Sequence, residues 1–76
     1  MKSLPSHWAQ VLLAMPEAGM GFQVGNVRLR DGRQFNDVMI DSGQITRIRG
    51  RSPGDIPFEG EDVIEIEITN NRWDGA

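Results

Sequence analysis

The sequence predicts a mainly β fold, either a small barrel or a strongly bent antiparallel sheet of four or five strands, with a short N-terminal helix. Three observations predict it. Residues 22–50 have the pattern of a three-strand meander with two turns. In residues 64–69 isoleucines alternate with polar side chains, the period of a strand with one buried face. An apolar stripe with helical spacing precedes both.

The apolar residues of the meander change phase along the strands, which predicts bends. Val24 and Val27 would lie on opposite faces of a regular strand, and Gly25-Asn26 between them predicts a bulge or a bend that reconciles the two faces. Repeated changes of phase favour strands that curl into a small barrel over a flat sheet. The other changes of phase lie between Phe35 and Val38 and between Ile45 and Ile48.

Asp31-Gly32 is the clearest turn signal in the chain, because it follows the alternating stretch from Val27 to Arg30. A type I′ turn needs a positive φ at both central residues, which glycine adopts freely and aspartate tolerates. We therefore expect a type I′ turn at Asp31-Gly32. Ser42-Gly43 is a weaker signal for the second turn.

Residues 1–20 form a separate N-terminal segment with a short helix at about residues 7–15. We expect Ser6 to be its N-cap and Pro16 to end it. Such a short helix is unstable alone, so its stripe covers one open end of the barrel or binds a partner chain. The stripe consists of Trp8, Val11, Leu12 and Met15.

Residues 21–69 form the single small β domain, and residues 70–76 form a polar C-terminal tail. In the last strand we expect Ile64, Ile66 and Ile68 to face the core. Residues 50–55 have the composition of a loop, and we expect the Phe58 side chain to be buried beneath it. Trp73 in the tail either packs back onto the barrel or is an anchor for a partner.

The charges are segregated along a chain whose net charge is −3. Six of the eight basic residues lie within residues 28–51, and six of the eleven acidic residues lie within residues 55–67. We expect the last strand to lie beside at least one arginine-bearing strand, so that Glu65 and Glu67 pair with arginines. The alternative is a free basic face that attracts a polyanion.

The composition excludes several kinds of chemistry. The chain contains no cysteine and one histidine, His7. No serine lies in a nucleophile-elbow sequence, no glycine-rich stretch matches a phosphate-binding loop, and the acidic run lacks EF-hand spacing. We therefore predict no enzyme, no cofactor and no metal. No stretch is long enough to span a bilayer, and the lack of cysteine favours a cytoplasmic protein.

Two resemblances carry further expectations. The stretch from Val27 to Phe35 and the tripeptide Ile48-Arg49-Gly50 resemble the two motifs of the Sm-like family of SH3-like small β-barrels. The resemblance implies a barrel, and in that family the arginine and glycine help to hold RNA bases in oligomeric rings. The chain from residue 15 to residue 73 also looks like a group of small uncharacterised bacterial proteins, which implies a compact unit without an assigned activity.

Together these observations favour a protein-interaction module that binds a protein partner or itself. The alternative is an Sm-like RNA-binding barrel that uses its arginines, including Arg51. A third class is a subunit that acts only within an assembly. The candidate contact residues are Arg28, Arg30, Arg33, Arg47, Arg49, Phe58 and Trp73.

Overall fold

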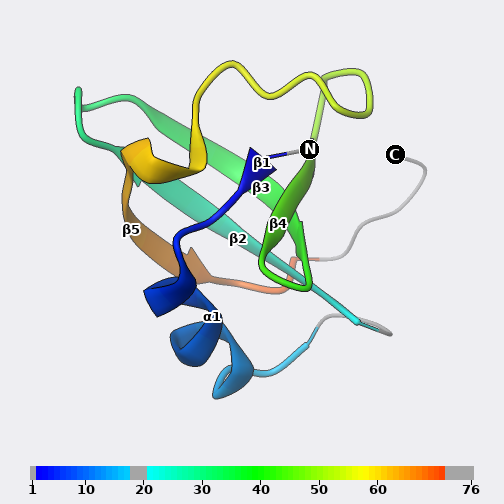
Figure 1. Ribbon diagram of the computed structural model, residues 1–76. Coiled ribbons are helices and arrows are strands. Elements are labelled where there is room, and N and C mark those ends of the chain that lie inside the picture. Colours follow the sequence, from blue (N-terminus) through cyan, green and yellow to red (C-terminus); the bar gives the residue numbers. More distant parts are fainter. Residues whose placement is uncertain (1, 18–20, 72–76) are drawn as a thin grey trace.

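A computed structural model describes residues 2–17 and 21–71 of the chain (Figure 1). One antiparallel sheet has the strand order β1-β4-β3-β2-β5 and curls into a half-barrel, with a short N-terminal helix below it. This confirms the predicted mainly β fold in the form of a strongly bent sheet. The elements are β1 (Lys2–Ser3), α1 (Ser6–Leu13), β2 (Phe22–Leu29), β3 (Gln34–Asp41), β4 (Gln44–Ile48), a 3-10 turn η1 (Gly60–Asp62) and β5 (Val63–Ile68).

A shift in register lies at Gly25-Asn26 as expected, but the extra residue of the bulge belongs to β3 and not to β2. Gly25 pairs with Val38 and Val27 pairs with Phe35, so Asn26 of β2 faces two residues of β3. The amide of Asn26 holds this irregular geometry, because its Oδ1 accepts from the backbone N–H of Asp37 at 3.3 Å. The phase change predicted between Ile45 and Ile48 is also a shift in register. Met39 of β3 pairs with Arg47 and Ile40 pairs with Ile45, so Thr46 of β4 is an extra residue. These shifts bend the sheet.

The type I′ turn lies at Ser42-Gly43, for which no type was predicted, and not at Asp31-Gly32. Ser42 and Gly43 have φ of 52° and 78°, the values of a type I′ turn, whereas Asp31 keeps a negative φ. In the β2–β3 connection, only Gly32 has a positive φ. The backbone N–H of Leu29 donates to the carbonyl oxygen of Arg33, and the carbonyl oxygen of Leu29 accepts from the N–H of Gly32. The prediction for Asp31-Gly32 was therefore wrong in type, although both turns lie where expected.

The core fills the concave side of the half-barrel. Phe58 is 5% exposed and its ring lies 5.0 Å from that of Phe35, so its side chain is buried in the core. The N-terminal residues also contribute, since β1 pairs with β4 and brings Leu4 into the core. The buried cluster comprises Leu4, Leu12, Val27, Leu29, Val38, Ile40, Ile45, Ile48, Ile56, Phe58 and Val63.

The helix differs from its prediction in two ways. It begins at Ser6 with Pro5 as the N-cap residue, so Ser6 is not the cap. Only part of the predicted apolar stripe packs against the sheet. Leu12 is buried and Trp8 packs against the core, whereas Val11 and Met15 remain exposed. The helix ends at Leu13, and Leu4 already fills the core beside its first turn.

The closing strand pairs with β2, which confirms that it lies beside an arginine-bearing strand. Arg28 pairs with Glu65 and Leu29 pairs with Val63, so Ile64 is an extra residue at a bulge. The bulge turns Val63 into the core and leaves Ile64 47% exposed. The prediction that Ile64 faces the core was therefore wrong, whereas Ile66 and Ile68 do pack against it.

Candidate functional site

Gln23, near the start of β2, connects the helix to the sheet. Its side chain is 7% exposed, and its Nε2 donates to the carbonyl oxygens of Leu12 at 2.8 Å and Met15 at 3.2 Å. Carbonyl groups at a helix C-terminus lack partners within the helix, and the Gln23 amide supplies one. The sequence did not predict this role of Gln23, because its only signal was a glutamine between the apolar residues Phe22 and Val24.

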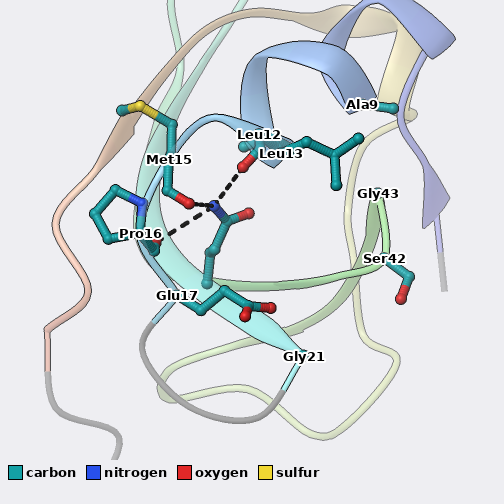
Figure 2. Close-up of a pocket in the computed structure, with 10 residues that line it drawn as sticks. Ala9, Leu12, Leu13, Met15, Pro16, Glu17, Gly21, Ser42 and Gly43 are labelled. Atoms are coloured by element: carbon teal, nitrogen blue, oxygen red, sulfur yellow. Dashed lines mark hydrogen bonds between the residues drawn. The ribbon is translucent and has the colours of Figure 1, made fainter.

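A cavity of about 630 Å³ opens beside this connection (Figure 2). It lies between the C-terminal end of α1, the chain that follows the helix, the start of β2 and the turn between β3 and β4. Its size is within the range of small-molecule and side-chain binding pockets. Its polar groups are few: the Gln23 amide, the Glu17 carboxylate and the Ser42 hydroxyl.

Exposed apolar side chains border the cavity. Leu13 is 87% exposed and Met15 is 39% exposed. In Figure 2, Leu13 lies between the helix end and the Ser42-Gly43 turn. We call this surface the helix-end patch, and it consists of Ala9, Leu13, Met15 and Pro16.

The arginines are largely neutralised by nearby acids, mostly not those of the closing strand. Arg28 pairs with Glu65 at 3.0 Å, as predicted, but Glu67 instead accepts a hydrogen bond from Asn26. Arg30 donates to the carbonyl oxygen of Glu61 at 3.1 Å, and Arg47 is half-buried with contacts of its own. The remaining ion pairs of these arginines are Arg33–Asp31, Arg49–Asp37 and Arg51–Asp55.

Two of these arginines gather around a half-buried aromatic ring. The guanidinium carbons of Arg33 and Arg51 each lie 5.8 Å from the centre of the Phe35 ring. Phe58, predicted as a contact residue, is buried beneath Phe35 and so presents no exposed surface there. Trp73, the other aromatic candidate, lies outside the described residues.

The turn between β2 and β3 contains a carboxyl group with a lowered pKa. The backbone N–H of Arg33 donates to Asp31 Oδ1 at 3.0 Å, and this bond, with the Arg33 guanidinium at Oδ2, lowers the pKa of Asp31. A carboxyl group with a lowered folded-state pKa stabilises the fold above its unfolded-state pKa. That contribution disappears as the pH falls through the folded-state pKa.

We therefore expect Asp31→Asn to destabilise the fold near neutral pH, because the charged hydrogen-bond acceptor is lost. The difference in the free energy of unfolding between the wild type and the variant should shrink as the pH falls below about 4. Urea unfolding at a series of pH values measures it. A difference that stays constant from pH 7 to pH 2 would contradict the role given to the Asp31 carboxylate.

The described residues do not bring together a nucleophile and a base. The Ser42 hydroxyl donates to Asp41, and the rings of His7 and Trp8 lie 5.2 Å apart at the start of the helix. Within residues 2–17 and 21–71, no three histidine, aspartate or glutamate side chains are placed to hold a metal ion. The one α-helix in these ranges is too short to cross a membrane.

No protein-family model, curated protein or solved structure matches the chain.

Proposed function

We propose that this protein is a non-enzymatic interaction module that self-associates through the helix-end patch, in a cytoplasmic setting. The observation that carries the proposal is the position of Leu13, which is 87% exposed beside an open cavity of about 630 Å³. Single exposed leucines are common on proteins. Leu13 differs from such a leucine, because it protrudes next to a cavity much larger than its own side chain. One surface therefore carries both an apolar side chain and a cavity that can accept it.

A second copy of the chain is the occupant that fits this arrangement. In a twofold dimer the same patch lies on both sides of the interface, so each Leu13 can enter the cavity of the other copy. The rim of the cavity bears one carboxylate, Glu17, and its floor is formed in part by Leu12. A chain of 76 residues has a small core, and association is a common way to add buried apolar surface.

Leu13→Glu should abolish self-association, because a carboxylate would have to leave water and enter a cavity that already bears the Glu17 carboxylate. Light scattering on a size-exclusion column should give the wild type a mass above 8.5 kDa that rises with concentration, and the variant a constant 8.5 kDa. Val11→Glu is the matched control, since Val11 is 48% exposed on the same helix but does not line the cavity. A wild type that stays monomeric at every concentration, or a Leu13→Glu chain that associates normally, contradicts the proposal.

RNA binding is the second candidate, and the grouping of Arg33 and Arg51 around Phe35 favours it. Aromatic rings and arginine side chains are the groups on which unpaired bases stack. The ion pairs of both arginines with aspartates oppose it. A mixed pool of short RNAs on the same column separates the two functions: a shift at low salt that disappears at high salt would indicate RNA binding.

A further inference from the structure

β5 is the outer strand of the sheet, and one of its edges pairs with no strand of residues 2–17 and 21–71. It lies at the end of the strand order and at the rim of the half-barrel (Figure 1). Its other edge pairs with β2, where the N–H of Thr69 donates to the carbonyl oxygen of Val24 at 3.0 Å. Backbone groups alternate in direction along an antiparallel strand. The backbone groups of Glu65 and Glu67 therefore face β2, and those of Ile66 and Ile68 face the open edge.

The charges and apolar side chains of β5 determine which sequence of added strand would pair favourably with its open edge. Glu65 and Glu67 are exposed on one face of β5, while Ile66 and Ile68 are half-buried on the other. A second copy of β5 in antiparallel pairing would bring like charges together, which is unfavourable. A strand in which basic and apolar residues alternate would bring opposite charges together. β2 shows this pairing within the chain, since Arg28 lies 3.0 Å from Glu65.

We propose that the open edge of β5 binds an extended segment of a partner protein, in which lysine or arginine alternates with apolar residues, as an added antiparallel strand. The backbone groups of Ile66 and Ile68 hydrogen-bond to the segment. Its basic side chains lie beside Glu65 and Glu67, and its apolar side chains continue the row of Ile66 and Ile68. This edge is separate from Leu13 and the cavity, so the proposal holds whether or not the chain self-associates.

A capped hexapeptide of three Lys-Val repeats tests the proposal with the full chain. We expect saturating peptide to slow hydrogen exchange of the Ile66 and Ile68 amides at least tenfold, measured by NMR. The amides of Glu65 and Glu67, already bonded to β2, should not change. Glu67→Lys should weaken binding about tenfold, because an attraction becomes a repulsion. A Glu-Val hexapeptide is the charge control and should bind at least tenfold more weakly.

Backbone methylation of the peptide distinguishes an added strand from simple charge attraction. Residues directly opposite each other in an antiparallel pair have side chains on the same face. The valines opposite Ile66 and Ile68 therefore direct their N–H groups to β5. Methylating the valine nitrogens should abolish binding, and methylating the lysine nitrogens should preserve it. Equal effects of the two methylations, binding that leaves the Ile66 and Ile68 amides unprotected, or protection of these amides in the free chain at high concentration would each overturn the proposal.

Discussion

Replacing Gly25 with alanine should destabilise the fold by about 3 kcal/mol, a large part of the stability of a domain this small. Gly25 lies at the bulge where β2 passes between β3 and β5. A Cβ atom at this position would lie 2.5 Å from the carbonyl oxygen of Glu67 and 3.2 Å from the Cα of Ile68. Both atoms belong to the backbone of β5, so relief requires β5 to move away from β2 rather than a side chain to rotate.

Urea unfolding of the Gly25→Ala chain measures this effect, and Gly32→Ala is the matched control. Gly32 has a φ of 97° with open space around it, so alanine there is strained only in its backbone, at a cost of about 1–2 kcal/mol. A Gly25→Ala chain as stable as the wild type would show that β5 does not approach β2 so closely.

Replacing Gln23 with leucine should cost about 2 kcal/mol and loosen the helix from the sheet. Leucine has a similar volume but no donor, so the carbonyl oxygens of Leu12 and Met15 would lose the amide that serves both. The Leu12 carbonyl keeps the backbone N–H of Met15 as a donor, so the cost is that of the two lost hydrogen bonds, about 0.5–1.5 kcal/mol each. Because the amide holds the C-terminal end of α1, hydrogen exchange in the helix should accelerate more than in β2 or β3.

Gln34→Leu is the control for this variant. The Gln34 side chain is exposed and donates to the side chain of Asn36, so its loss should change stability by less than about 0.5 kcal/mol. Urea unfolding and hydrogen exchange on both variants make the comparison. If Gln23→Leu leaves the helix as protected as in the wild type, the packing of Trp8 and Leu12 is sufficient to dock it.

Much of the fold could be predicted from local pattern. The phase change around Gly25-Asn26 predicted the place of the register shift, although its extra residue lies in β3, and the alternation of residues 64–69 predicted a strand beside at least one arginine-bearing strand. The types of the turns were harder to predict than their positions, because the hydrogen bonds of Leu29 with Arg33 and Gly32 decide the geometry at Asp31. These bonds depend on how β2 and β3 are aligned, which the residues of the turn do not specify.

The candidate site was less predictable, because it depends on contacts between distant segments. Trp8, Val11, Leu12 and Met15 have the spacing of one helix face, but the contribution of Leu4 to the core and the end of the helix at Leu13 leave part of that face in water. The role of Gln23 depends on the approach of a helix end to β2, which no local pattern encodes. The arginines were found as a group, but Arg33 and Arg51 pair with the nearby Asp31 and Asp55 and not with the acids of the closing strand.

The most direct test of the proposed function is a dilution series of the wild-type chain followed by methyl NMR. Self-association through the helix-end patch predicts that the methyl signals of Leu13 and Met15 shift with concentration. The signals of Ile40 and Ile45, buried in the sheet, should stay fixed. Shifts confined to other methyl groups, such as those of Ile64, or no shift at any concentration, would contradict the assignment of the helix-end patch as the contact surface.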